Sequence, residues 1–376
     1  MADSIRVLFQ GRRDILASRG GDAIQLRATR QYLGKIGVLV DFDPSFTCDC
    51  SCYDLVHLFN MTRPYEPKLQ MANAKRQSKL VCLSTIYWNM DDLQREMATP
   101  IPLWLSAVRI VLRSVRWVRG LFSEQARHVY REGRLMSSLE VVKAYQQAII
   151  EGVDVLLPNS KTELDLLQRD FPIAQDKPSI VIHNCIDGEV FHDPSSVKRD
   201  WGSAHGLGEF IMCAGRIEPR KNQLRLLEAM SQTSIPVVLV GSPGASRAYA
   251  AQVRRHMKPQ DLILSEVDQE ELCQIYAAAR VHVLPSLYET PGLSSLEAGA
   301  MGCNLVMSDI GSQREYFGDY VEYCDAYSVE DIKSAVEQAW VRPWPNLELA
   351  FYIRANYVWE VAAQETLGVY ERLLGC

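Results

Sequence analysis

An α/β fold with two doubly wound parallel sheets is the architecture that this 376-residue sequence predicts. Strand-like and helix-like segments alternate almost from end to end, which is typical of parallel strands covered by helices on both faces. The alternation comes in two successive sets, and a polar stretch with little apolar periodicity, 187–208, separates them. We therefore expect one domain over 1–187 and a second over 188–357, facing each other across a cleft at the carboxyl ends of their strands.

The first set starts with an apolar run of strand length, Ile5-Arg-Val-Leu-Phe9. Later runs of the same kind, such as Val81-Cys-Leu83, alternate with longer segments that have helical length. The expected strands are 5–10, 37–42, 54–60, 79–84, 153–157 and 179–183, and the expected helices are 22–35, 64–77, 124–151 and 160–170.

The second set repeats the pattern, with runs such as Ile211-Met-Cys-Ala214 as its strands. Its last helix, near 358–374, is amphipathic, because Val361, Leu367 and Leu373 are among the apolar positions that recur along it. The expected strands are 209–214, 236–241, 261–264, 280–284 and 304–307, and the other expected helices lie near 221–232, 245–257, 268–279, 293–302 and 328–340.

The composition is that of a soluble globular protein, with 47% hydrophobic and 23% charged residues. A formal net charge of −6 argues against a nucleic-acid-binding protein, so we expect no nucleic acid as a partner. The start is polar and no apolar run reaches the roughly 20 residues that a membrane span needs. We expect a cytoplasmic protein, with attachment to the inner face of a membrane left open.

The ten cysteines are spread along the chain, and several stand inside apolar runs, which is typical of buried free thiols in a reducing compartment. Cys48, Cys50 and Cys52 form the one cluster, on one side of an extended segment. A zinc site would need a second pair of ligands, so we interpret them as ordinary thiols and expect no metal.

Two glutamates, Glu289 and Glu297, stand where a strand-like run gives way to a helix-like run. Glu289 is on the connecting loop, and Glu297 is one to two turns into the helix on the face toward that loop. Between them, Gly292 lets backbone N–H groups approach a ligand at the positive end of the helix. Carboxylates that can hold sugar hydroxyls thus flank an anion site, which predicts a sugar linked to a diphosphate.

Two cations bracket the turn after another expected strand, in Gly215-Arg-Ile-Glu-Pro-Arg-Lys221. Arg216 offers a fork of donors and Lys221 a point charge at the end of a parallel strand, facing the next helix. This arrangement suits a diphosphate. The alternative is that both are solvated loop charges or partners of Glu218.

At this point the sequence resembles the retaining glycosyltransferases of the GT-B fold, family four, also called glycosyl transferases group 1. The resemblance rests on the stretches 215–229 and 284–319, with an Arg and a Lys after one strand and E-x7-E after another. The stretch 182–191 resembles the link between that family's two Rossmann-like domains, with Cys185 in place of the usual Gly. The resemblance covers most of 155–376.

The resemblance implies roles for the site residues. Arg216 and Lys221 would hold the donor diphosphate, Glu289 would contact the transferred sugar, and Glu297 would bind the nucleotide ribose. N–H groups near Gly292 and Leu293 would meet the phosphate. The donor would be a UDP- or GDP-sugar, transfer would need no metal, and the helix at 358–376 would cross back to complete the first domain.

The first domain fits the family less closely. Ser18-Arg-Gly-Gly-Asp22 resembles the Gly-rich turn after the first strand, where Gly20 and Gly21 would allow a close backbone approach; the alternative is a surface loop. Many relatives carry a His after a central strand, whereas 83–89 has none and offers Tyr87 or Trp88 against a sugar face or in the core.

Two other residues of this domain need an interpretation. His57 lies inside an apolar run, so we interpret it as structural. Arg63 follows that run and is a candidate for an anionic group of the acceptor.

The segment 101–122 has the composition of a basic amphipathic helix. Arg109, Arg113 and Arg116 fall on one stripe, and tryptophan, leucine and valine residues supply the apolar area. Such a helix can lie on an anionic membrane surface, which would fit a lipid-linked acceptor. The alternative is a helix packed on the first domain with a solvated basic side.

The sequence therefore favours a hexosyltransferase that moves a sugar from a nucleotide-diphosphate-sugar donor to a glycan or lipid-linked acceptor, in the synthesis of cell-envelope polysaccharide or glycolipid. Two alternatives stay open. One is a sugar-nucleotide epimerase of the same fold, and the other is a non-catalytic sugar-nucleotide-binding module, which the missing His suggests.

Overall fold

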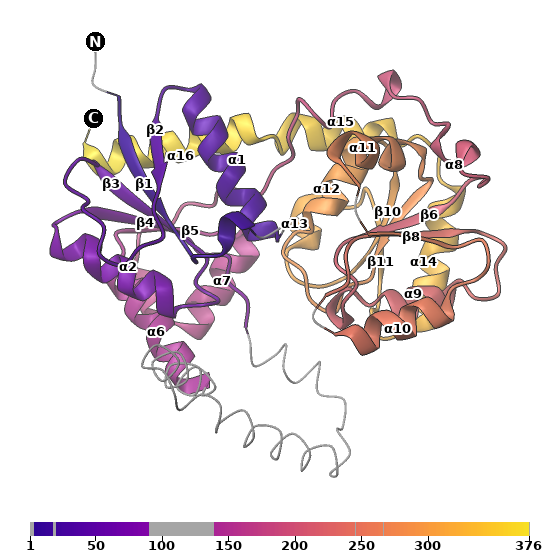
Figure 1. Cartoon of the computed structure of the whole chain (residues 1–376), viewed down its shortest axis with the longest axis horizontal. Coiled ribbons are helices and arrows are strands. Elements are labelled where there is room, and N and C mark those ends of the chain that lie inside the picture. Colours follow the sequence, from indigo (N-terminus) through magenta and orange to yellow (C-terminus); the bar gives the residue numbers. More distant parts are fainter. Residues whose placement is uncertain (1–3, 18–19, 90–138, 245, 266, 376) are drawn as a thin grey trace, which may run out of the picture.

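The protein folds into two α/β lobes joined side by side, as seen in a computed structural model (Figure 1). The structure describes residues 4–17, 20–89, 139–244, 246–265 and 267–375. Each lobe contains one parallel sheet with helices on both faces, so the predicted fold class is confirmed. The boundaries predicted for the domains in the sequence stay a prediction.

The first lobe contains a five-stranded parallel sheet in the order β2-β1-β3-β4-β5. Every residue of β3, the central strand, is buried, because helices cover both faces of the sheet. The strands are β1 Arg6–Gln10, β2 Leu39–Phe42, β3 Leu55–Phe59, β4 Leu80–Ser84 and β5 Val155–Leu157. The helices are α1 Gly21–Lys35, α2 Tyr65–Arg76, α6 Leu139–Gly152 and α7 Lys161–Asp170, with 3-10 turns η1 Ile15–Ala17 and η3 Pro172–Asp176.

Two predictions for this lobe need comment. The strand expected at 179–183 is wrong: the segment makes one isolated bridge, Leu156 to Ser179, and continues as irregular chain. β5 is only three residues long and Pro158 follows it, so no donor is left there to extend the ladder. The helix expected at 124–151 is present as α6, and residues 124–138 lie outside the described residues.

The second lobe contains a six-stranded parallel sheet in the order β11-β10-β9-β6-β7-β8. The sequence did not predict β11, α8, α13 or α15. The first three are too short to show a period, and no element is expected between residues 340 and 358. The strands are β6 Ile211–Ala214, β7 Val237–Val240, β8 Leu262–Leu264, β9 Val281–Leu284, β10 Asn304–Ser308 and β11 Glu322–Cys324. The helices are α8 Trp201–Ala204, α9 Gln223–Ala229, α10 Arg247–His256, α11 Gln269–Ala278, α12 Leu293–Ala300, α13 Gln313–Phe317, α14 Val329–Val341 and α15 Leu347–Asn356, with 3-10 turns η4 Pro194–Ser196 and η5 Pro219–Lys221.

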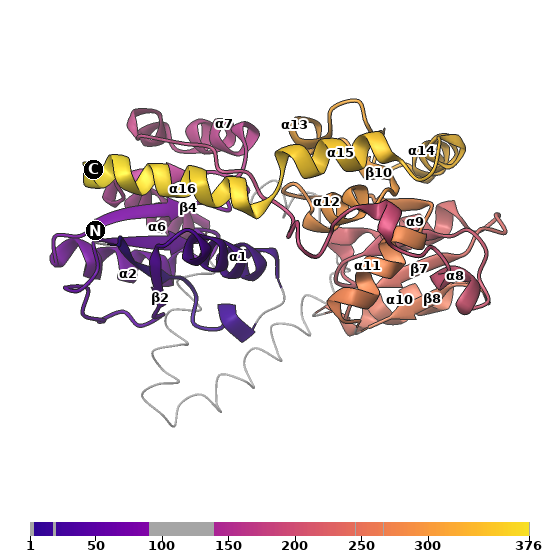
Figure 2. The ribbon, with the colours of Figure 1, turned by 90° about the horizontal axis from the view of Figure 1, so that it is seen from above.

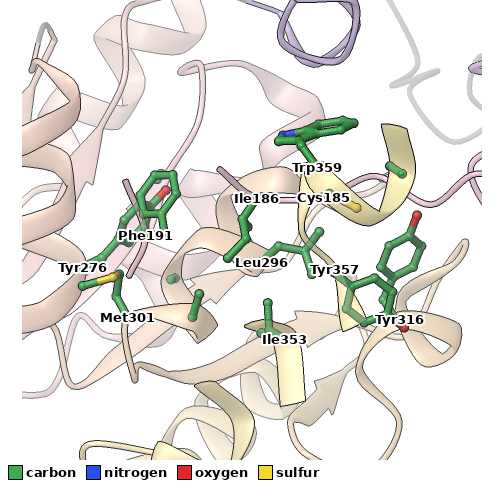
Figure 3. Packing of buried hydrophobic residues seen from close by; sticks show 14 of the residues in the cluster. Cys185, Ile186, Phe191, Tyr276, Leu296, Met301, Tyr316, Ile353, Tyr357 and Trp359 are labelled. Atoms are coloured by element: carbon green, nitrogen blue, oxygen red, sulfur yellow. The ribbon is translucent and has the colours of Figure 1, made fainter. Parts of the chain in front are cut away.

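The chain passes between the lobes twice, and the two passages are bonded to each other. Ile186 forms a parallel bridge with Val358: its N–H donates to the Tyr357 carbonyl at 2.9 Å, and its carbonyl accepts from the Trp359 N–H at 3.1 Å. Figure 3 shows Ile186 beside Leu296 of α12, with Tyr357 and Tyr316 close together. Apolar packing thus continues from one lobe to the other through this crossing.

The C-terminal helix α16, Trp359–Leu374, returns along the first lobe, where it packs on α1 (Figure 2). The hydroxyl of Tyr370, in α16, lies 2.6 Å from Nδ1 of His57, and Nε2 of the same ring lies 2.9 Å from Ser84 Oγ. Burial lowers the pKa of His57 to about 3, so the ring is neutral and serves as a hydrogen-bonding core residue. The predicted crossing helix is therefore confirmed.

Candidate active site

The two loops predicted to hold cations and carboxylates meet at one edge of the second sheet. β6 and β9 are neighbouring parallel strands, so the turn after β6 and the loop after β9 emerge side by side. The Asn222 amide donates to the Pro285 carbonyl at 3.0 Å, and the Leu287 N–H donates to the Arg220 carbonyl at 2.8 Å. These bonds fix the two loops to each other.

Glu289 is at the centre of this edge and is buried. Its carboxylate accepts hydrogen bonds from Lys221 Nζ, from Arg220 at 3.3 Å and from Ser286 Oγ at 3.2 Å. Burial opposes ionisation, but Lys221 and Arg220 outweigh it and lower the pKa of Glu289 to about 2. The carboxylate is therefore ionised and held between two cations.

Arg220 is a member of this cluster that the sequence did not single out. Its guanidinium donates to Glu218 at 3.0 Å and to the Tyr288 carbonyl at 2.9 Å, besides Glu289. The spacing of basic residues in 216–221 gives no reason to prefer Arg220 over Arg216. The 3-10 turn η5 determines which arginine joins the cluster, because it turns Arg220 and Lys221 toward the loop after β9.

Arg216 lies outside the cluster. Its side chain is 58% exposed, and its Nε lies 3.7 Å from Glu218. The contact with Glu218 is the alternative that the sequence left open, but an exposed guanidinium beside a buried ionic cluster also leaves its other donors available to a ligand. The role predicted for Arg216 at the diphosphate stays a prediction.

Gly292 precedes α12 with φ of +76°, a left-handed conformation that favours glycine. A methyl group there would lie 3.1 Å from Leu284 and 3.3 Å from Glu289, so a side chain would also be tightly packed. Among the hydrogen bonds of the described chain, none uses the N–H groups of Gly292 or Leu293. Such donors at a helix start suit an anion, and the phosphate contact stays a prediction.

Glu297 is one turn farther along α12 and has a different environment. It is half-buried, and its carboxylate accepts from the Tyr276 hydroxyl at 2.9 Å. Burial raises the pKa of Glu297 to about 7, although the hydrogen bond from Tyr276 opposes the shift. With no cation among its contacts in the described chain, Glu297 remains able to accept hydrogen bonds from ligand hydroxyls.

The start of α1 brings the first lobe to this edge. A methyl group on Gly21 would lie 3.8 Å from Leu293, so the N-termini of α1 and α12 approach each other from opposite lobes. Gly20 is the N-cap of α1, with extended backbone. Of the two predicted glycines, Gly21 thus faces α12. Arg63 has a 64% exposed side chain and lies 3.9 Å from Asp14 on the first lobe, outside the cluster around Glu289.

Trp88 brings a side chain of the first lobe against the cluster. Its ring lies 4.8 Å from the Tyr288 ring, and the Arg220 guanidinium lies 5.5 Å from the indole centroid. The indole N–H is buried without a hydrogen-bond acceptor. Tyr87 instead donates its hydroxyl to Asp170 at 2.8 Å within the first lobe, so of the two aromatic candidates Trp88 faces the site.

The loop that carries Trp88 is held in a strained conformation. Ile86 has φ of +46°, which is rare for a β-branched residue. The residues on either side are fixed by buried Glu163, which accepts from the Thr85 hydroxyl and, at 2.6 Å, from the Tyr87 N–H. Backbone strain of this kind persists when the surroundings enforce it, and it is often found at functional sites.

Two predictions concern parts of the chain or ligands beyond this site. The basic segment 101–122 lies outside the described residues, so its membrane role stays a prediction. No helix in the described ranges combines the length and apolar character needed to cross a membrane. Across the same ranges, no group of three His, Cys, Asp or Glu side chains is arranged to hold a metal ion.

Comparison with known proteins supports the resemblance. Residues 202–350 match the family model "Glycosyl transferases group 1". The chain is 30% identical to O-antigen chain mannosyltransferase B of Escherichia coli and 25% identical to D-inositol 3-phosphate glycosyltransferase of Mycobacteroides abscessus, over 44% and 61% of this chain. It spans about half the length of these relatives, 46% and 54%.

Among solved structures, sucrose-phosphate synthase from Thermosynechococcus elongatus has a similar fold, with a TM-score of 0.73 over 99% of both chains at 17% identity. This likeness confirms the GT-B fold, and the match of residues 202–350 to the family model confirms the resemblance to glycosyl transferases group 1.

Proposed function

We propose that this chain, whose residues 202–350 match glycosyl transferases group 1, is a retaining glycosyltransferase that uses a nucleotide-diphosphate-sugar donor. The observation that carries the proposal is the cluster of Glu289, Lys221 and Arg220 beside the start of α12. It combines buried cations, an ionised carboxylate and free helix N–H groups within one edge of a sheet.

The cluster suits the two halves of such a donor. Negative charge grows on the leaving diphosphate during glycosyl transfer, and preorganised cations and backbone donors stabilise it. Arg216, Lys221 and the N–H groups of Gly292 and Leu293 would bind the diphosphate. The ionised Glu289 would accept hydrogen bonds from hydroxyls of the transferred sugar, and Glu297 would accept those of the ribose.

The finer parts of the proposal follow from this assignment. We expect a hexosyl group, a UDP- or GDP-linked donor and a glycan or lipid-linked acceptor, in cell-envelope polysaccharide or glycolipid synthesis. Protein cations around Glu289 can neutralise the diphosphate, so we expect activity without a metal. Retention of anomeric configuration also belongs to the proposal, as do family four and a location at the inner face of the membrane.

A non-catalytic sugar-nucleotide-binding module is the second candidate, favoured by the absence of His from 83–89. An epimerase has less support, because it needs acid and base groups around the sugar, and His57 and His282 are both buried with pKa values lowered to about 3 by burial.

The test is a thermal-shift screen of UDP-, GDP- and ADP-sugars, followed by an assay for released nucleoside diphosphate. A preferred donor should raise Tm by mass action and then be consumed, with the sugar appearing on an acceptor or in water. Binding without release from any donor would favour the module. Conversion of one sugar nucleotide into another would favour the epimerase.

A further inference from the structure

The side chain of Glu315, in the second lobe, reaches the first turn of α7 in the first lobe. Its carboxylate accepts hydrogen bonds from the Lys161 N–H at 2.6 Å and from the Thr162 N–H and hydroxyl, both at 2.9 Å. His183 Nε2, in the segment that joins the lobes, lies 3.4 Å away. Both overall views place α13, which carries Glu315, beside α7 (Figures 1 and 2).

The N-terminus of α7 needs these contacts. The first N–H groups of a helix have no partner inside the helix. Ser160, the N-cap, accepts from the Glu163 N–H at 2.9 Å, which leaves the N–H groups of Lys161 and Thr162 to be satisfied from elsewhere. A carboxylate at this position is also favoured by the helix dipole. The first lobe therefore supplies half of the cap of α7, and the second lobe supplies the other half.

Glu315 is ionised in this position. Burial opposes ionisation, but hydrogen bonds from His183 and from Thr162 and Lys161 outweigh it and lower the pKa of Glu315 to about 2. Hydrogen bonds from an N–H to a charged carboxylate are about twice as strong as those between neutral groups. The contact of Glu315 with the start of α7 is therefore stronger than the same contact between neutral groups would be.

Apart from Tyr316, several polar groups at this interface lack hydrogen-bond partners. The Tyr316 hydroxyl donates to the Asn159 carbonyl at 2.5 Å and accepts from the Asn184 N–H at 2.8 Å. In contrast, Asn159 Nδ2, Asn184 Oδ1 and both amide atoms of Gln313 are buried without a partner. The polar connection between α13 and the first lobe therefore rests mainly on Glu315 and Tyr316.

The segment before Glu315 is packed against the loop after β9 that carries Glu289, which we call the donor loop. Gly311, four residues before Glu315, has φ of +59°, and a methyl group there would collide with the Glu289 carbonyl. Ser308 Oγ, at the end of β10, donates to the Ser286 carbonyl at 2.6 Å. A short, closely packed segment thus joins the loop of Glu289 to the residue that caps α7.

We propose that Glu315 is a positioning residue that holds the first lobe at the separation from Glu289 that sugar transfer requires. It contacts neither Glu289 nor Glu297, so it acts through α7 and the donor loop rather than on the substrate. The activity part of this proposal rests on the proposed function. Because α7 follows β5 at the carboxyl edge of the first sheet, loss of the cap would loosen the acceptor side relative to the donor side.

The test compares Glu315→Ala and Glu315→Gln with a matched control, Asp309→Asn, in the intact protein. Asp309 is in the same segment and pairs with Arg314 at 2.6 Å within the second lobe, so its loss breaks an ion pair without touching the first lobe. Solution X-ray scattering reports the separation of the lobes, nucleotide titration reports donor binding, and steady-state kinetics report transfer.

We expect Glu315→Ala to raise the radius of gyration and to lower kcat for transfer about 10-fold or more, because a misplacement of about 1 Å can be that costly. Donor affinity should stay within about 3-fold of wild type on this account. Glu315→Gln keeps one acceptor oxygen, so its radius of gyration and kcat should lie between those of wild type and Glu315→Ala. Asp309→Asn should match wild type in both.

Unchanged scattering and kcat in the folded Glu315→Ala protein would overturn the proposal. So would a loss of donor affinity as large as the loss of kcat, because that would place Glu315 in the donor site itself. If Glu315→Ala does not fold, Glu315→Gln decides by the same criteria. Scattering does not depend on activity, so failure of the proposed function and failure of this inference are distinguishable.

Discussion

The two lobes meet near Glu289 with sides that are built from different chemistry. On the second lobe, Glu289 is held between Lys221 and Arg220 in a buried ionic cluster. On the first lobe, the side that faces it offers Trp88 with an unpartnered indole N–H and Gly21 at the start of α1. A charged, preorganised edge suits a diphosphate donor, whereas an aromatic edge suits a neutral sugar face. On the proposed function, changes on one side should therefore alter donor binding and changes on the other should alter acceptor recognition.

The largest effect is expected from Lys221→Met, which removes the buried cation from the charged side. Transfer should fall by about 100-fold to 1,000-fold, because a preorganised charge at the leaving group is lost. Breaking a buried pair from one side should also cost about 3–5 kcal/mol of unfolding free energy, measured by denaturant unfolding. Lys333→Met, which removes an exposed partner of Glu337, is the matched control and should change neither. An unaffected kcat in the Lys221 variant would contradict the proposal that Lys221 stabilises the leaving diphosphate.

A smaller effect is expected on the aromatic side. Trp88→Phe keeps most of the ring packing against Tyr288 but removes the indole N–H. If that N–H donates to a substrate hydroxyl, kcat/KM should fall about 10-fold, the equivalent of one hydrogen bond, while Tm changes little. Trp340→Phe serves as the control, since Trp340 packs beside Arg280 away from the cluster. Equal kinetics for both variants would mean that Trp88 only fills space.

The smallest effect is a pH dependence that comes from Glu297. Its folded pKa of about 7 is above the ordinary value of 4.5, so the folded state holds this proton more tightly than the unfolded state. Stability from this group is therefore fully present below about pH 4.5 and is lost as pH rises to about 7. Glu297→Gln should flatten the unfolding free energy over that window. An identical pH profile in the variant and wild type would show that Glu297 does not titrate there.

The fold was predictable because it depends on local periodicity. Buried strands such as β3 and β6 are short apolar runs, and amphipathic helices such as α16 repeat their apolar positions, so the sequence alone indicates them. The strand predicted at 179–183 is wrong because its partner β5 ends at Leu157, just before Pro158, which is a property of the neighbour rather than of the segment. The short elements β11 and α13 carry no period to recognise.

The site was predictable only in part. Glu289, Lys221 and Gly292 were identified from their spacing around strand ends, and the structure brings them together. The place of Arg220 and the capping of α7 by Glu315 depend on which loops meet in space, and spacing along the chain does not contain that information. Arg63 was selected for its charge, but its exposed position beside Asp14 gives no further support for the prediction.

The central claim is that Glu289 holds the transferred sugar of a nucleotide-diphosphate-sugar donor. The most direct measurement compares wild type with Glu289→Gln, using the donor that the thermal-shift screen selects, and follows both donor affinity and sugar transfer. Glu337→Gln, an exposed carboxylate of the same lobe, is the control. We predict that Glu289→Gln lowers kcat for transfer by at least about 100-fold while the folded protein still binds the nucleoside diphosphate. Transfer at the wild-type rate by Glu289→Gln would contradict the account.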